Sequence, residues 1–315
     1  FDKGTIKLSD EREFPMKDMN FPTIDPVDPY QMTDEEQDLV EKLMHSFMQS
    51  DKLKKHLNCL YANGSMYLAI NQNLLYHASI PLDEYGQFKK VNIQGREYSG
   101  KLFMNKVDRL VRAAYFEKED LKTRDFALDY MWYLWCGKDS PLFDKSAMTT
   151  FERYFIEDKA THIEEKGYYF EFQDQRETCE MILEEFGLEG PDTHIINGHV
   201  PVKAVKGESP MRAGGKLLVI DGGFSRAYQS STGIAGYTLI FNSQGIQLVQ
   251  HEPFESAKAV IERGGDIQSV TVVREFISSR MLVKDTDNGK KLISQVDDLR
   301  KLLDAYRLGL IKEKE

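Results

Sequence analysis

Two histidines stand where a β-type run of residues gives way to a loop. His77 ends the run in "NLLYHASIP", and His199 follows the run in "HIINGHVPV". Gly198 lets the backbone turn where a side chain would clash, and Pro201 prevents a central strand from continuing. Loops at the carboxyl ends of strands converge on ligand-binding crevices in layered α/β proteins. We therefore expect both imidazoles to face one polar pocket, although a histidine at a strand end is more often structural.

The glycine-rich loop 221–236, "DGGFSRAYQSSTGIAG", follows another β-type run. Backbone donors together with Arg226 suit the approach of an anion such as a phosphate. A surface turn with a solvated arginine is an equally good interpretation. The loop lacks the lysine followed by serine or threonine of a P-loop, and Ser225 is not in a G-x-S-x-G nucleophile elbow.

The other potential ligands have weaker contexts. Five histidines are expected to be structural or solvent-facing: His45, His56, His162, His194 and His251. The cysteines Cys59, Cys136 and Cys179 are odd in number and widely spaced, so they form neither a disulfide framework nor a C-x-x-C site. This usage favours a reducing, cytoplasmic compartment, with Cys136 and Cys179 buried and inert.

Composition limits the classes of partner. The chain of 315 residues has a net charge of −10, and its pI is near 5.3. Nucleic acids and anionic membranes require clustered basic side chains, so neither is expected as a partner. No apolar run has the length of a membrane span.

The elements that must position the histidines alternate between helical and β-type patterns. Residues 1–32 contain the proline-rich "FPMKDMNFPTIDPVDPY" and predict an extended leader. Thr33 and Glu36 form a capping box that opens a helix reaching about residues 52–55. A strand pair follows, then helices between about 100 and 137, a helix ending at Gly187, and further strands. These patterns predict a mixed-sheet α/β sandwich over 33–285 and a terminal amphipathic helix over 286–315.

Three segments carry a family resemblance: "LLYHASIPLD", "DTHIINGHVPVKAVKGESP" and "KLLVIDGGFSRAYQSSTGIAGYTLIFNSQGIQLVQHEPF". They resemble the C-terminal half of class III, Firmicute-type fructose-1,6-bisphosphatase, a relative of the calcineurin-like metallophosphoesterases. The resemblance implies an α/β/β/α metallophosphoesterase sandwich of which this chain supplies the C-terminal part. It also implies hydrolysis of fructose 1,6-bisphosphate to fructose 6-phosphate and phosphate, a step of gluconeogenesis.

The same resemblance implies roles for particular residues. His77 and His199 match the family's metal-binding histidines, Arg226 becomes a ligand for the substrate phosphate, and two divalent cations, manganese by family preference, are expected in the complete enzyme. The second histidine that many members carry after the G-H pair is replaced here by Pro201. Asp83 and Asp221 lie near the motifs, but they lack the spacing of the aspartates that bridge the metals.

The family's early motifs have no counterpart in these residues. G-D-x-H-G, G-D-x-x-D-R-G and G-N-H-E would supply the bridging aspartate, further ligands and a catalytic histidine. We therefore expect a missing N-terminal half as a partner, a chain that is inactive alone, and exposed apolar surface that favours a homo-oligomer. The alternatives are another metallophosphoesterase, acting on phosphoproteins or dinucleoside polyphosphates, and a non-catalytic binding or regulatory module.

Overall fold

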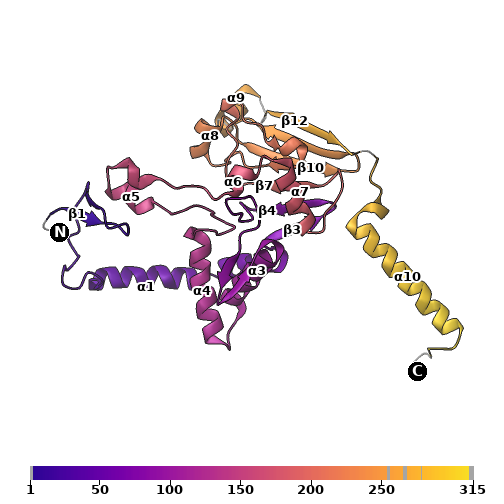
Figure 1. Ribbon diagram of the computed structural model, residues 1–315, viewed down its shortest axis with the longest axis horizontal. Coiled ribbons are helices and arrows are strands. Elements are labelled where there is room, and N and C mark those ends of the chain that lie inside the picture. Colours follow the sequence, from indigo (N-terminus) through magenta and orange to yellow (C-terminus); the bar gives the residue numbers. More distant parts are fainter. Residues whose placement is uncertain (1–2, 254–255, 265–267, 278, 312–315) are drawn as a thin grey trace. The chain divides into compact units, whose positions relative to one another are not determined.

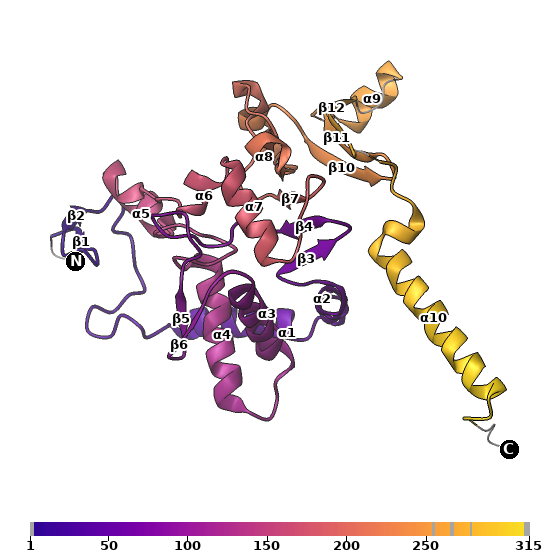
Figure 2. The same ribbon diagram turned by 45° about the vertical axis from the view of Figure 1, so that its right-hand side comes forward.

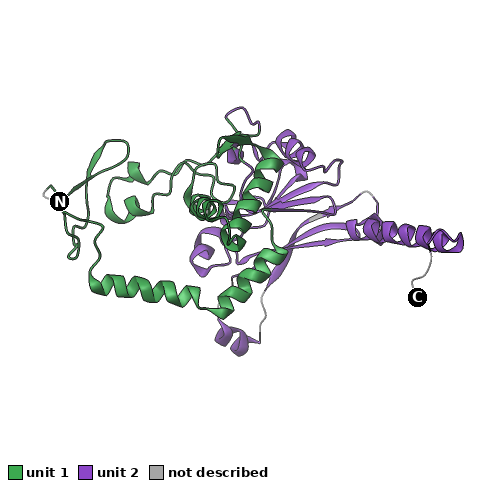
Figure 3. Ribbon diagram, turned by 90° about the horizontal axis from the view of Figure 1, so that it is seen from below, with its two compact units in different colours: residues 1–66, 81–83, 88–168 green, residues 67–80, 84–87, 169–315 purple. Residues whose placement is uncertain are grey.

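The computed structural model describes residues 3–253, 256–264, 268–277 and 279–311. These residues divide into two compact units (Figure 3). Unit 1 comprises 1–66, 81–83 and 88–168, and unit 2 comprises 67–80, 84–87 and 169–315. Each unit is assembled from separate stretches of the chain, and the segment 33–285, expected to be the C-terminal part of a metallophosphatase domain, is shared between the two units.

Unit 1 is mainly helical. The Thr33 side chain accepts a hydrogen bond from Glu36 N, so the capping box expected from the sequence is present. The helix stops at Met48 instead of reaching the lysines at 52–55, because Ser50 caps a second helix. Unit 1 contains β1 Thr5–Lys7, β2 Glu13–Pro15, α1 Asp34–Met48, α2 Asp51–Asn63, β5 Val91–Ile93, β6 Arg96–Tyr98, α3 Gly100–Phe116, α4 Leu121–Cys136, α5 Thr150–Phe155 and the 3-10 turn η1 Lys159–His162.

Within the N-terminal 32 residues, predicted to be an extended leader, the structure forms a hairpin near the start, while residues 17–32 contain no helix or strand. β1 and β2 form an antiparallel hairpin in which Ile6 pairs with Phe14. Phe14 is buried, and Lys17 N donates to Phe155 O at 2.8 Å. The sequence pattern did not indicate this hairpin because each strand is only three residues long, too short to show a period-2 pattern.

The helix pair α3 and α4 supplies most of the core of unit 1. α3 buries Phe103, Met104, Val107 and Leu110, which recur at helical spacing. Cys136, expected to be buried, is half-buried because it is the last residue of α4. The helical pattern read between 100 and 137 is thus confirmed, and the burial expected for Cys136 is wrong.

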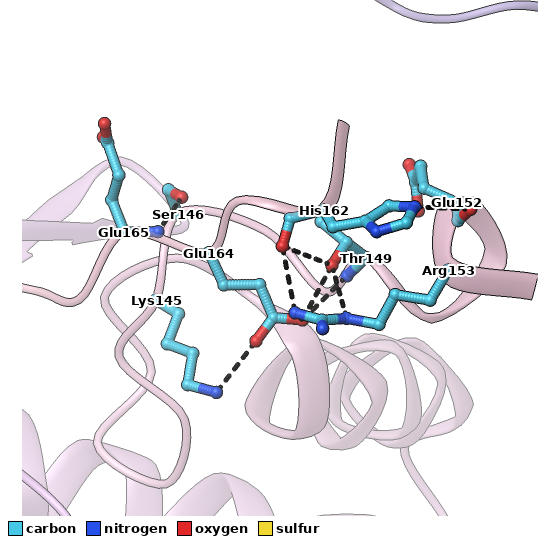
Figure 4. A network of polar contacts seen from close by, with 8 residues as sticks. All are labelled: Lys145, Ser146, Thr149, Glu152, Arg153, His162, Glu164 and Glu165. Carbon is cyan, nitrogen blue, oxygen red and sulfur yellow. Dashed lines mark hydrogen bonds and ion pairs between the residues drawn. The ribbon is translucent and has the colours of Figure 1, made fainter. Parts of the chain in front are cut away.

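A polar network in unit 1 holds the segment before α5 against the segment after η1 (Figure 4). Glu164 accepts hydrogen bonds from Lys145 Nζ at 2.9 Å and from Thr149 N at 3.1 Å. Arg153 and His162 complete it through Thr149 Oγ1 and backbone oxygens. Because Thr149 is the N-cap residue of α5, Glu164 ties down the start of that helix.

Unit 2 is built on a mixed five-stranded sheet with the strand order β3-β4-β7-β9-β8. Three of its strands, β3, β4 and β7, are labelled in Figure 1. β4, β7 and β9 are parallel, while β3 and β8 pair antiparallel at the two edges. The strands span β3 Tyr67–Ile70, β4 Asn73–Tyr76, β7 His194–Asn197, β8 Met211–Arg212 and β9 Leu217–Val219. Every residue of β7 and β9 is buried, as expected for parallel strands covered on both faces.

The second sheet of unit 2 is antiparallel, with the order β10-β11-β12 (Figure 2). Its strands are β10 Gly236–Asn242, β11 Gly245–His251 and β12 Ser269–Phe276. The remaining elements are α6 Tyr169–Phe172, α7 Arg176–Glu185, η2 Ala204–Lys206, η3 Ala213–Gly215, α8 Arg226–Thr232, α9 Ala257–Arg263, η4 Val283–Asp285 and α10 Asp287–Arg307. The mixed α/β class expected from the sequence is confirmed.

Among the described residues, no helix is both long enough and apolar enough to cross a membrane.

Candidate metal centre at the carboxyl ends of three parallel strands

The two histidines singled out in the sequence follow neighbouring parallel strands. His77 comes directly after β4, and His199 comes two residues after β7. The register pairs Leu75 with Ile196, so both strands end at the same edge of the sheet. Asp221 follows the third parallel strand, β9, in the same way. Three potential ligand side chains are therefore carried at adjacent strand ends.

The imidazole rings of His77 and His199 face each other. Nε2 of His77 lies 3.1 Å from Nδ1 of His199, and the ring centroids are 5.0 Å apart at an interplanar angle of 70°. Two imidazole nitrogens bound to one tetrahedral cation at about 2.0–2.1 Å would lie about 3.3 Å apart. The two rings make a hydrogen-bond contact whose length is close to the nitrogen separation at a shared cation, so the expected convergence of the two rings is present.

The backbone at His199 has an unusual conformation. Its φ angle is +67°, and Val200 N donates to Gly198 O at 2.8 Å, which closes a three-residue turn. A non-glycine residue in this left-handed region costs of order 1–3 kcal/mol and is often found at functional sites. The sequence interpretation assigned the tight turn to Gly198, but a Cβ there would make only ordinary contacts, 3.5 Å from Asp221 Cβ. The strained residue is the histidine.

A series of buried hydrogen bonds joins residues at the ends of β4 and β7. Asn197 Nδ2 donates to Tyr169 OH at 2.8 Å and to Ala78 O at 3.3 Å. The Tyr169 hydroxyl is also 2.8 Å from the Tyr76 hydroxyl. Gly198 N donates to His77 O at 2.9 Å, so the loops that carry the two histidines are joined directly. These contacts limit how far the imidazoles can separate.

The electrostatic surroundings favour a neutral imidazole at His77. Desolvation by the surrounding chain lowers the pKa of His77 below its usual value, although the residue is partly exposed to solvent. The negative charge of Asp221 acts in the opposite direction and raises that pKa. A neutral imidazole is the form that binds a metal.

Arg226 begins α8, and its side chain is exposed. The structure replaces the expected open loop with a short helix after the glycine pair. Gly222 is required by packing, since a Cβ there would lie 2.6 Å from Gly236 Cα, and Gly223 is required by its φ of +66°. The role of Arg226 in binding phosphate remains a prediction.

The donor set fits a divalent cation in part. Two imidazole nitrogens at a suitable separation and one nearby carboxylate suit manganese, iron or zinc. Within the described ranges, however, no group of three or more His, Cys, Asp or Glu side chains is close enough to hold a metal ion. Sequence reasoning gave Asp221 little weight, and it is the parallel pairing of β9 with β7 that places Asp221 at the same edge of the sheet.

The other histidines have structural partners or lie at the surface. His162 Nε2 lies 3.0 Å from both Glu152 O and Ile156 O, and His251 contacts Thr238 and Ser269 across the antiparallel sheet. His194 is buried beside Glu275. His45 and His56 are exposed on α1 and α2. None of these five arrangements contributes to the His77–His199 pair.

The fold and the site define an α/β protein with a pair of facing imidazoles at the carboxyl ends of parallel strands. The chain belongs to the Firmicute fructose-1,6-bisphosphatase family, whose sequence model matches residues 1–308. It is 64% identical over 315 residues to the class 3 fructose-1,6-bisphosphatase of Porphyromonas gingivalis and 62% identical over 314 residues to that of Bacteroides fragilis. The class 3 fructose-1,6-bisphosphatase of Alkaliphilus metalliredigens is 56% identical over 315 residues.

These alignments cover 100%, 100% and 99% of this chain, but only 48%, 47% and 47% of the relatives from Porphyromonas, Bacteroides and Alkaliphilus. The chain therefore spans about half the length of the curated relatives that it matches. No solved structure matches it.

Proposed function

We propose that this chain is part of an enzyme that hydrolyses fructose 1,6-bisphosphate to fructose 6-phosphate and phosphate in gluconeogenesis. The observation that carries the proposal is the pair of imidazoles facing each other at 3.1 Å, at the carboxyl ends of β4 and β7. Membership of the family and the printed names of the relatives support the choice of a sugar bisphosphate as the substrate.

Each candidate residue has a distinct part in this proposal. His77 Nε2 and His199 Nδ1 bind a cation, and the buried hydrogen bonds of Asn197 keep the two rings together. Bound divalent cations, manganese in the first instance and two in the complete enzyme, would supply Lewis acidity and a nucleophilic water. Arg226 presents a planar guanidinium to a phosphate group through paired hydrogen bonds.

In this proposal, different segments of a longer protein supply different metal ligands. We propose that this chain is the C-terminal part of a metallophosphoesterase sandwich in the cytoplasm, and that a further segment supplies the anionic ligands. Two imidazoles with a single nearby carboxylate should hold a divalent cation weakly. The chain alone is therefore expected to be a poor phosphatase.

The test is an assay of phosphate release from fructose 1,6-bisphosphate with manganese, for the full-length protein and for residues 1–315 alone. In the full-length protein, His77→Ala and His199→Ala should each lower kcat/KM by about a hundredfold or more. Removal of a residue that only supports a metal ligand already lowers metal affinity or activity by about ten- to a hundredfold. His56→Ala, on the exposed face of α2, is the matched control and should leave activity unchanged.

Three outcomes would contradict parts of the proposal. Full activity of His77→Ala would remove the imidazoles from the site, and robust turnover by the isolated chain would show that it carries enough ligands by itself. Preferential hydrolysis of a phosphopeptide or a dinucleoside polyphosphate would identify a different metallophosphoesterase.

A further inference from the structure

We infer that Asp221 is a positioning residue of the same centre, whose carboxylate draws a divalent cation to the His77–His199 pair. The inference rests on the proposed function, because it assumes that the two imidazoles bind a cation. It adds a third strand end, that of β9, to the two that carry the histidines.

Backbone hydrogen bonds tie the Asp221 loop to the loop that carries His199. Ile220 N donates to Asn197 O at 2.9 Å, which continues the pairing of β9 with β7 beyond the strands. Val202 N donates to Asp221 O at 2.7 Å, so the chain on the far side of His199 is also fixed to Asp221. Together with the bond from Gly198 N to His77 O, these contacts join the ends of β4, β7 and β9.

One carboxylate oxygen of Asp221 accepts a hydrogen bond, and the other lies toward the loop that carries His199. Oδ1 accepts a hydrogen bond from Gly223 N at 2.9 Å, which fixes the orientation of the carboxylate. Oδ2 lies on the side of Gly198, 3.9 Å from the place that a Cβ on Gly198 would occupy. The same place is 3.9 Å from the backbone oxygen of His77, so the Asp221 carboxylate and the His77 backbone lie on the same side of Gly198.

This arrangement suits an indirect role better than direct ligation. Asp221 does not form a three-ligand group with the two histidines among the described residues. The negative charge of a half-buried carboxylate beside the two imidazoles still lowers the free energy of a cation there, because electrostatic attraction is stronger near a protein than in bulk water. Removal of a carboxylate that supports metal ligands typically weakens metal affinity by about ten- to a hundredfold.

The experiment compares Asp221→Asn with the wild type in the full-length protein, using manganese titration by calorimetry after removal of metal with a chelator. Asparagine retains the size of the side chain and an oxygen for Gly223 N, but it removes the charge. Asp192→Asn is the matched control, because it removes the same charge near the start of β7, at the opposite end of the strand. Thermal unfolding of each metal-free variant is measured in parallel.

We expect the manganese Kd to rise about ten- to a hundredfold for Asp221→Asn and to change less than about twofold for Asp192→Asn. The ratio of Kd between Asp221→Asn and wild type should shrink at high potassium chloride concentration, because an electrostatic effect is screened and a purely structural effect is not. An unchanged Kd in Asp221→Asn, with manganese binding intact in the wild type, would overturn the inference and leave the proposed function standing. A wild-type protein that neither binds manganese nor hydrolyses the bisphosphate would overturn both.

Discussion

Backbone strain and the proposed metal binding have opposite requirements at His199. Its φ of +67° is a conformation that glycine adopts without cost, whereas an L side chain there is strained. His199→Gly should therefore raise the free energy of unfolding of the metal-free protein by up to about 1 kcal/mol, the relief of strain being partly offset by the entropy of glycine. The same substitution should abolish manganese binding, because one of the two facing imidazoles is lost.

The matched control for His199→Gly is Gln72→Gly. Gln72 also has a φ of +67°, in the turn between β3 and β4. It should be stabilised to a similar degree without any loss of manganese affinity. Urea unfolding with a chelator present measures the stabilities. A His199→Gly variant less stable than wild type by about 1 kcal/mol or more would contradict the account of strain.

At the scale of elements, one carboxylate fastens the segment between α4 and η1. Burial acts to raise the pKa of Glu164, but hydrogen bonds from Lys145 and Thr149 and the charge of Lys145 outweigh it and lower that pKa to about 2 (Figure 4). Glu164→Gln should therefore reduce the free energy of unfolding at neutral pH by roughly 1–3 kcal/mol. Glu165→Gln is the control, because the exposed side chain of Glu165 lies outside these contacts.

The pH dependence of the Glu164 contribution has a definite sign. A depressed carboxyl pKa stabilises the fold fully above the unfolded value of about 4.3. The contribution is lost as the pH falls from there toward about 2, where the folded carboxyl takes up its proton. The difference in unfolding free energy between wild type and Glu164→Gln should shrink over that interval. A difference that stays constant with pH would show that Glu164 acts through packing alone.

Elements with strong local signals were predictable from the sequence. The capping box at Thr33 and Glu36 and the left-handed Gly187 after α7 appear where the sequence puts them. The break between α1 and α2 was missed because the apolar spacing continues across it, and only the Ser50 cap marks the boundary. α8 was missed because glycines and hydroxyls dominate its composition, which is typical of a loop.

The candidate site was predictable in its two histidines and not in its third strand end. Each histidine follows a β-type run, and that is a local feature. Which strands lie side by side is decided by tertiary packing, and His77 and His199 are 122 positions apart. Asp221 becomes a candidate only when β9 is known to lie beside β7 in parallel, since its own local sequence also suits an ordinary glycine turn.

At the scale of the whole of unit 2, a contact between a buried histidine and a half-buried glutamate connects the two sheets. His194, the first residue of β7, is 3% exposed, and its Nε2 lies 3.3 Å from Oε2 of Glu275 in β12. Burial lowers the pKa of His194, Glu275 and Asp192 act to raise it, and Lys216 acts to lower it further. The pair thus lies where the antiparallel sheet meets the start of a central strand.

The pKa of His194 is lower in the folded chain than in the unfolded chain. As the pH falls, His194 is therefore protonated in the unfolded chain before it is protonated in the folded chain. The stability that a neutral His194 contributes is complete above the unfolded value of about 6.5 and is lost progressively below it, by at most about 1.4 kcal/mol per pH unit. His194→Gln should flatten the fall in unfolding free energy between neutral and mildly acidic pH. Glu275→Gln should extend the fall to lower pH, because it removes a charge that favours protonation. Identical slopes in wild type and His194→Gln, measured by urea unfolding, would contradict this.

The separation of His77 from His199 also has a consequence for synthesis on the ribosome. Between them the chain contributes most of unit 1, from residue 88 to residue 168. At about 5–20 residues per second, roughly 6–25 seconds pass between the addition of the first histidine and the addition of the second. Throughout that interval β4 has only β3 as a partner, and a two-stranded hairpin is marginally stable in water. The helices α3 and α4 can meanwhile fold from local contacts, so the nascent polypeptide completes these helices before the sheet edge that carries both histidines exists.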